Sequence, residues 1–143
     1  MPDAAEQPLE MILARNLISI ISLGAMLVDT EGAIVFYNEA AAEVLGARFE
    51  ETGRIPQEAW RAEIGPFDED GTRLPVRNLP VTVALRDGRP GYGRFYIESA
   101  NAGMIPIEAT ALPLIGSAGH HGALVVFWPL DAEHAWPLQD TET

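Results

Sequence analysis

The chain of 143 residues contains no cysteine. Disulfide bonds, thiolate metal sites, cysteine nucleophiles and cysteinyl flavin adducts are excluded, because each of them needs a thiol. Basic residues are also few: nine lysines and arginines stand against 21 aspartates and glutamates, and the formal net charge is −12. Such a surface repels nucleic-acid phosphates and anionic lipids. We therefore expect neither nucleic acid nor membrane as a partner.

Long apolar runs are absent as well. The longest, residues 17–28, is interrupted by Ser19, Ser22 and Gly24 and is shorter than the roughly 18 to 20 residues that a membrane span needs. Asp3 and Glu6 stand where a signal peptide would be positively charged. These features predict a cytoplasmic protein.

The apolar content is enough for one compact domain. Hydrophobic residues make up 48% of the chain and charged residues 21%, so global disorder is not expected, and the length suits a single core. We predict a disordered N-terminus over residues 1–8, a domain over residues 9–130, and a tail or linker over residues 131–143, where no periodic pattern continues.

The segment that begins at Leu9 has helical periodicity. Two apolar stripes run along it, and Gly24 is expected to end it. One stripe can cover the domain's own sheet, which leaves the other for self-association; the alternative is that both are buried within one chain. The stripe predicted to form a homodimer contact contains Leu9, Leu13, Leu17 and Ile20.

Two short apolar strands follow, over residues 25–28 and 33–37, and the turn 29–32 joins them. Asn38 is expected to cap a short helix that Gly46 ends. Residues 47–75 give mixed signals, with one short helix predicted at 57–63. A longer helix is predicted over residues 79–87, with Asn78 as its N-cap and Gly88 after its end.

Three more strands are predicted at residues 93–98, 104–114 and 123–130. In the middle one, apolar residues alternate with others, as in a half-buried antiparallel strand. Its inward row includes Ala109 and Ala111, and such small residues either leave room for a ligand or are covered by larger side chains from the helices. The element order indicates an α+β fold, with five strands and helices on one face.

Three stretches resemble the PAS domain family of bacterial sensor and signalling domains. The first has Gly24–Asp29 followed by Gly32, Ile34, Asn38 and Ala40–Ala41; the second has Asp70–Thr72 leading to Leu79–Val81 and Ala84–Gly88; the third has Ala111–Leu114 and Gly122–Phe127. The resemblance covers Leu9 to Leu130. It implies a five-stranded antiparallel sheet in the order 2-1-5-4-3, with helices on one face and an N-terminal helix.

The resemblance also bears on cofactors. Family members that bind haem place a histidine on the long helix, and residues 79–87 contain none; members that bind flavin covalently need a cysteine. We expect neither cofactor. His120 and His121 are adjacent in a glycine-rich loop, without the carboxylate support typical of a metal site, so no metal is expected. The Asp-Ile-Thr ending common in the family is replaced after Phe127 by Trp128–Asp131, which leaves the output route to any effector open.

A regulatory sensor module is the function that these features predict. Its cavity would accept a small apolar ligand, and the N-terminal helix would relay the change through a dimer contact to an effector protein or domain. The cavity is predicted to be lined by Phe36, Leu45, Leu79, Val83, Phe95, Ile107, Ala109 and Val126.

Two alternatives stand beside this prediction. One is a ligand-free domain for protein–protein interaction or dimerisation, with a filled core. The other is an α+β cone resembling ketosteroid isomerase, in which a buried Glu108 acts as base. The second needs a carboxylate whose pKa is raised in an apolar cavity. No catalytic arrangement follows from residue spacing, so we expect no enzyme.

Overall fold

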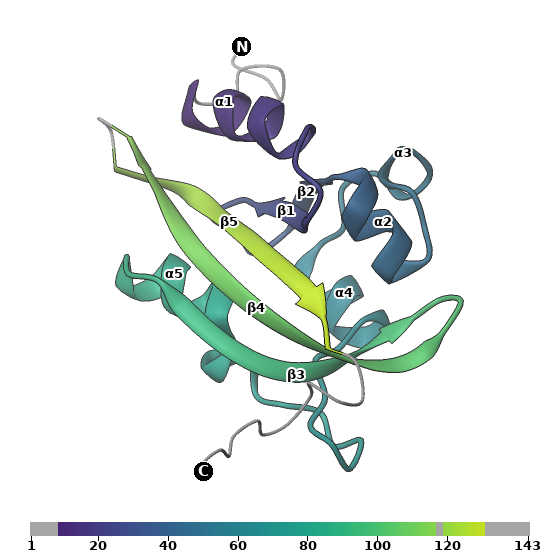
Figure 1. Ribbon diagram of the computed structural model, residues 1–143. Coiled ribbons are helices and arrows are strands. Elements are labelled where there is room, and N and C mark those ends of the chain that lie inside the picture. Colours follow the sequence, from purple (N-terminus) through teal and green to yellow (C-terminus); the bar gives the residue numbers. More distant parts are fainter. Residues whose placement is uncertain (1–8, 117–118, 131–143) are drawn as a thin grey trace, which may run out of the picture.

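Five antiparallel strands form one curved sheet in the order β2-β1-β5-β4-β3 (Figure 1). The computed structural model describes residues 9–116 and 119–130, and the termini predicted at residues 1–8 and 131–143 lie outside this range. The strands are β1 (Gly24–Val28), β2 (Ile34–Tyr37), β3 (Gly91–Ser99), β4 (Gly103–Gly116) and β5 (Gly119–Pro129). The predicted fold class and strand order are confirmed.

The β1–β2 hairpin forms because its turn supplies its own hydrogen bonds. The Asp29 carboxylate accepts from the backbone N–H of Glu31 at 2.9 Å and of Ala33 at 3.0 Å. Gly32 has φ +87°, a conformation that glycine adopts without steric cost. The chain therefore reverses within four residues and returns β2 beside β1.

Helices lie on both faces of the sheet. The inner face is covered by α2 (Glu39–Leu45), α4 (Gln57–Glu63) and α5 (Pro80–Asp87), with the short α3 (Phe49–Thr52) and the 3₁₀ turn Val76–Asn78 between them. The outer face carries α1 (Leu9–Ile18), which packs across β1 and β5. α1 is thus the N-terminal helix expected from the sequence, set apart from the other helices (Figure 1).

Two separate apolar clusters follow from this arrangement. Inner side chains of the sheet, such as Ile107 and Phe127, pack against the helices α2, α4 and α5. On the outer face, Met11, Ala14 and Ile18 of α1 are buried against β1 and the upper part of β5. Strands β1, β2, β4 and β5 contribute side chains to both clusters, because successive side chains point to opposite faces, whereas β3 contributes only to the inner cluster.

Three predicted boundaries need correction. α1 ends at Ile18, and Gly24 is the first residue of β1, not the end of the helix. Asn78 is not the N-cap of α5: it closes the 3₁₀ turn, and Leu79 takes the cap position with Pro80 as the first helical residue. The hairpin between β4 and β5 is also tighter than predicted, since the strands reach Gly116 and Gly119.

The glycines predicted to end helices are confirmed. Gly46 after α2 has φ +87° and Gly88 after α5 has φ +67°, and both donate the cap hydrogen bond to the preceding turn. Among the residues that the structure describes, no helix is long and apolar enough to cross a membrane.

Candidate functional site

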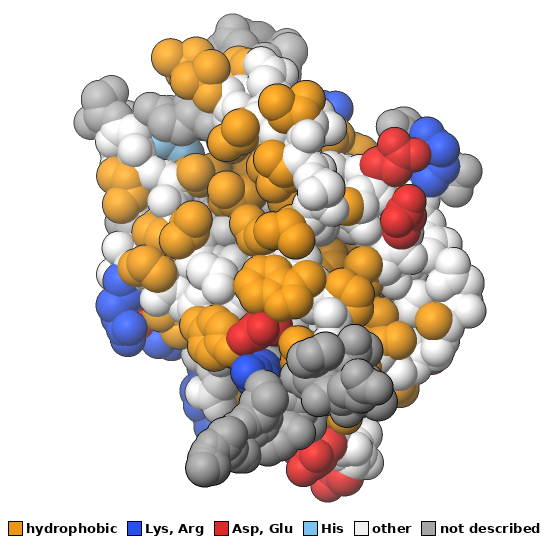
Figure 2. All heavy atoms as spheres, in the orientation of Figure 1, with side chains coloured by type: hydrophobic (Ala, Val, Ile, Leu, Met, Phe, Trp, Pro, Cys, Tyr) orange, Lys and Arg blue, Asp and Glu red, His pale blue; other side chains and the backbone are white. Residues whose placement is uncertain are grey.

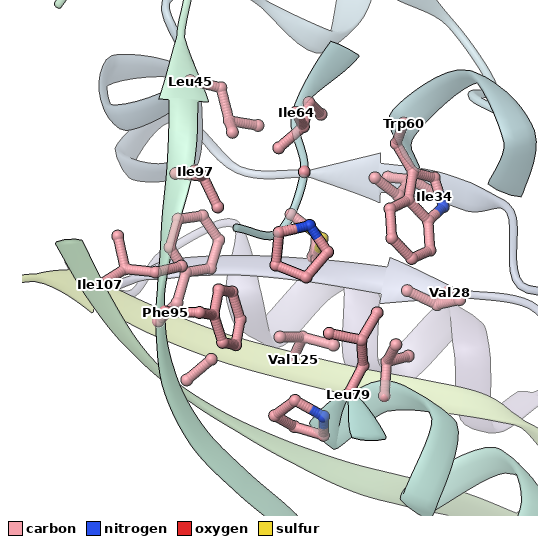
Figure 3. Close-up of a pocket in the computed structure, with 17 residues that line it drawn as sticks. Val28, Ile34, Leu45, Trp60, Ile64, Leu79, Phe95, Ile97, Ile107 and Val125 are labelled. Atoms are coloured by element: carbon pink, nitrogen blue, oxygen red, sulfur yellow. The ribbon is translucent and has the colours of Figure 1, made fainter. Parts of the chain in front are cut away.

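An apolar cavity of about 90 Å³ lies between the inner face of the sheet and the helices. All five strands contribute to its floor, β2 through Ile34, and α2, α4 and the start of α5 form its walls (Figure 3). Of the eight residues predicted to line it, five do so: Leu45, Leu79, Phe95, Ile107 and Ala109. Whether a ligand contacts them stays a prediction.

Phe36 and Val126 do not line this cavity, because they lie on the outer face. Phe36 pairs with Leu27, which α1 buries, and the Arg15 guanidinium lies 4.3 Å from the Phe36 ring centroid. Val126 points away from its neighbours Val125 and Phe127, which both line the cavity. The prediction that Phe36 and Val126 line the cavity is therefore wrong.

Val83 is also absent from the lining. It is half-buried on α5, while Val81, two residues earlier, reaches the cavity and Ala84 is fully buried. Residues three apart lie on the same face of a helix, so the buried face of α5 runs through Val81 and Ala84. Val83 lies to the side of that face.

One wall of the cavity was not predicted from the sequence. Trp60, Ile64 and Pro66 line it, and all three come from the stretch whose signals were mixed. Trp60 lies in the short helix that was predicted, and its indole N–H donates to the backbone oxygen of Gly32 at 2.8 Å. An aromatic residue in an otherwise polar helix was the one available signal for this wall.

The cavity offers a ligand no partner for a hydrogen bond. All 17 lining residues are apolar or glycine, and the one polar group among their side chains, the Trp60 N–H, is already used by Gly32. A ligand group that hydrogen-bonds water would lose those bonds here without replacement. The site therefore favours molecules without polar groups.

The residues present do not form a haem, flavin-adduct or metal site of the usual kinds. α5 (Pro80–Asp87) carries no histidine, and the chain has no thiol. Within residues 9–116 and 119–130, no cluster of three metal-ligating side chains occurs. The side chain of His120 lies outside the described part.

Glu108 lies on the outer face, not in the cavity, which corrects its role in the isomerase alternative. It is flanked along β4 by the cavity residues Ile107 and Ala109, so the pleat turns it away from them. The Tyr92 hydroxyl donates to its carboxylate, and the Trp128 indole N–H donates at 3.0 Å. The Tyr92 hydrogen bond holds the pKa of Glu108 below its ordinary value, and the nearby Arg94 charge adds to this.

A raised pKa in an apolar cavity was the condition for Glu108 to act as a base, and both parts of that condition fail. The carboxylate is ionised at neutral pH and held by donors from β3 and β5. The structure gives the isomerase alternative no support at this residue.

The predicted dimer stripe of α1 is exposed in the single chain. Leu9, Leu13 and Leu17 expose 64%, 57% and 55% of their surface, and Ile20 just beyond the helix exposes 80%. Figure 2 shows apolar side chains gathered over α1 and across the outer face of the sheet. The alternative in which both stripes are buried within one chain is wrong.

Comparison with known proteins gives matches by structure only. No family model matches the chain, and no curated protein matches it. Solved PAS structures do match. The PAS domain of a Colwellia psychrerythraea protein is 14% identical with a TM-score of 0.59, and the alignment covers 84% of this chain and 96% of that one.

Two further matches come from other bacteria. The PAS domain of nitrogen regulation protein NR(II) from Vibrio parahaemolyticus is 16% identical with a TM-score of 0.58, covering 82% of this chain and 98% of that one. The Rhodobacter sphaeroides LOV protein is 16% identical with a TM-score of 0.66, covering 86% and 68%. At these identities the likeness is one of fold, and by its fold this chain is a PAS-like domain.

Proposed function

We propose that this chain is a regulatory sensor module whose cavity binds a small apolar ligand. The observation that carries the proposal is the cavity of about 90 Å³ lined throughout by apolar residues. Close-packed interiors contain few voids larger than one water molecule, and a water site needs only about 10–15 Å³ together with polar partners. An apolar space several times larger is suited to an apolar guest.

The size of the cavity limits the ligand class. Pockets for drug-sized molecules have about 300 Å³ or more, whereas an engineered apolar cavity of about 150 Å³ binds benzene or xenon. The ligand we propose is therefore an uncharged molecule of about the size of benzene or smaller. A larger cofactor would need the helices to move outward.

Signalling would pass through a homodimer contact made by α1. Its stripe of Leu9, Leu13, Leu17 and Ile20 is exposed in the single chain, and contiguous exposed apolar surface is typical of interaction sites. Ligand binding would shift the packing between the sheet and its helices, and the dimer would carry that shift to an effector protein or domain.

The second candidate is a domain for protein–protein interaction that binds no ligand. The cavity falls well below the volume of ordinary ligand pockets, which favours this candidate, as does the apolar outer face (Figure 2). The two candidates share the dimer contact and differ only in whether a ligand binds in the cavity.

A titration with benzene separates them. Amide and methyl NMR signals of cavity residues such as Ile107 should shift and saturate in the wild-type chain. Ala109→Met places a tethered apolar side chain in the cavity and should abolish the saturable shifts, whereas Ala102→Met, which adds the same atoms in an exposed turn, should not. Absence of saturable shifts in the wild-type chain would leave the interaction domain as the better reading.

A further inference from the structure

Asn38 makes four side-chain hydrogen bonds to three different parts of the chain. Its amide oxygen accepts from the backbone N–H of Ala25 in β1 at 3.1 Å and of Ala41 in α2 at 2.9 Å. Its amide nitrogen donates to the carbonyl of Ile18 at the end of α1 at 2.8 Å, and to that of Leu23 at 2.9 Å.

The hydrogen-bonding capacity of this side chain is fully used. A primary amide offers two N–H donors and one oxygen with two lone pairs, and each of the four finds a backbone partner. Asn38 exposes only 4% of its surface, so water cannot replace a lost partner without rearrangement. Its backbone is fixed too, because its N–H donates to the Ala25 carbonyl at 3.0 Å.

The partners of Asn38 connect the two functional regions proposed above. α2 begins immediately after Asn38 and carries Leu45, which lines the cavity. α1, whose last carbonyl Asn38 holds, carries the exposed apolar stripe. α1 and α2 lie on opposite faces of the sheet, so the hydrogen bonds of the Asn38 amide connect a helix on one face with a helix on the other.

We propose that Asn38 is the positioning residue that couples the cavity to the N-terminal helix. When the cavity is filled, α2 shifts outward through Leu45, and Asn38 at the first turn of α2 moves with it. The carbonyls of Ile18 and Leu23 must follow or lose their donors, and a lost donor is costly in a buried site. The position of α1 on the sheet therefore responds to the cavity.

The first test is hydrogen exchange of the full chain, resolved by residue. Asn38→Ser retains an acceptor for the N-cap bond to Ala41 but removes the amide that reaches Ile18 and Leu23. Asn38→Asp keeps the shape and both acceptor bonds while removing both donors. In each variant the amides of the last turn of α1 should exchange about tenfold faster relative to the amides of β4.

The matched control is Tyr37→Phe, one residue away. It removes the hydrogen bonds of the Tyr37 hydroxyl, to the Ala47 carbonyl at 2.7 Å and with the Thr52 hydroxyl at 3.5 Å, and leaves the contacts with α1 in place. It should change the hydrogen-exchange rates of the α1 amides no more than those of the β4 amides. If α1 stays as protected as the sheet in both Asn38 variants, Asn38 does not position α1 and the proposal is wrong.

The second test measures whether filling the cavity changes α1. It depends on the proposed function only for the biological purpose of that coupling. Ala109→Met fills the cavity with a tethered side chain, so no ligand is needed. It should change exchange in the last turn of α1 about threefold or more in the wild-type background, and clearly less in the Asn38→Ser background. An unchanged α1 in the wild-type background, or an equal response in both, overturns the coupling. Failure of benzene to bind would instead count against the proposed ligand class alone.

Discussion

At the scale of single residues, the outer face of the sheet contains one charged cluster in an apolar setting. Glu108 on β4 receives hydrogen bonds from Tyr92 on β3 and Trp128 on β5, and Arg94 lies beside it, with its Nε 3.5 Å from a Glu108 oxygen. These four side chains stand on three adjacent strands. Tyr92, Trp128 and Arg94 together stabilise the charge of Glu108, the one acidic side chain of β4.

The first prediction concerns the pH dependence that this cluster produces. The pKa of Glu108 is lowered in the folded chain, mainly by the Tyr92 hydrogen bond. A lowered folded pKa contributes stability above the unfolded pKa of about 4.3, and this contribution is lost as pH falls through the folded pKa. Glu108→Gln should therefore lower the free energy of unfolding by about 1 kcal/mol at pH 7 and by much less below about pH 4.

Urea denaturation at several pH values measures this difference. Glu98→Gln, an exposed position on β3, is the control and should follow the wild-type chain throughout. A penalty for Glu108→Gln that is equally large at pH 3 and pH 7 would show that charge is not the cause.

The second prediction compares two glycines with positive φ. A Cβ at Gly46 (φ +87°) would lie 2.9 Å from the Cβ of Ala100 and 3.0 Å from its backbone nitrogen, whereas at Gly53 (φ +69°) nothing lies within 4 Å. Both alanine variants incur the left-handed strain of about 1 kcal/mol. Gly46→Ala adds a steric clash and should cost at least about 1 kcal/mol more.

Thermal or urea unfolding of the two variants checks the order. Equal destabilisation would mean that the segment around Ala100 yields easily, and that the contact between the end of α2 and the turn after β3 is loose.

The role of a single residue could be predicted from the sequence where that role depends only on its neighbours along the chain. The capping roles of Asn38 and Gly46 follow from side-chain chemistry within one turn of helix. The bonds from Asn38 to Ile18 and Leu23 span 20 and 15 residues. Hydrogen bonds between residues so far apart leave no pattern in the local sequence. The hydrogen bonds from Asn38 to Ile18 and Leu23 could therefore be identified only from the fold.

At the scale of elements, the faces of the strands were predictable only where the sequence alternates. β4 alternates clearly, and its cavity residues Ile107 and Ala109 were identified. β5 is apolar on both faces between Ala123 and Phe127, because α1 covers its outer side, so the pattern could not place Val126. In β2, a register shift opposite Leu27 and Val28 changes the phase of the pleat, and Phe36 was assigned to the wrong face.

The third prediction concerns the exposed stripe of α1. Leu13→Glu places a charge within the stripe and should convert a wild-type dimer into a monomer, because a buried unpaired carboxylate is costly. Ala102→Glu adds the same charge in an exposed turn between β3 and β4, away from α1, and should leave the dimer. Sedimentation velocity at about 100 µM distinguishes the species.

Two outcomes would count against the stripe. A wild-type chain that is monomeric at this concentration has no such dimer, and equal dissociation by Leu13→Glu and Ala102→Glu would show a general charge effect. A dimer that survives Leu13→Glu must use another surface, and the remaining outer face of the sheet would be the next to test.

At the scale of the whole molecule, the strand order came from a resemblance of residue patterns and not from periodicity. The elements and their sequence order limit the topology to an antiparallel sheet with helices, but several strand orders satisfy that limit. The cavity depends on the same long-range arrangement, since its walls come from segments between Met26 and Phe127. Its volume therefore could not be estimated from the sequence.

The fourth prediction follows from the net charge of −12 together with the apolar character of the α1 stripe. Two copies that associate through such a surface repel each other over a distance, and salt screens that repulsion while leaving apolar contacts intact. The Debye length falls from about 30 Å at 0.01 M salt to about 8 Å at 0.15 M. The dimer should therefore tighten several-fold over this range.

Sedimentation equilibrium in sodium chloride measures the dissociation constant at each salt concentration. Leu13→Glu, followed over the same range, should remain monomeric, which separates the specific dimer from general salting-out. If the wild-type dimer instead weakens as salt rises, ion pairs between the copies hold it together. The contact would then have to lie where arginines meet carboxylates, and the apolar stripe of α1 would not be the dimer surface.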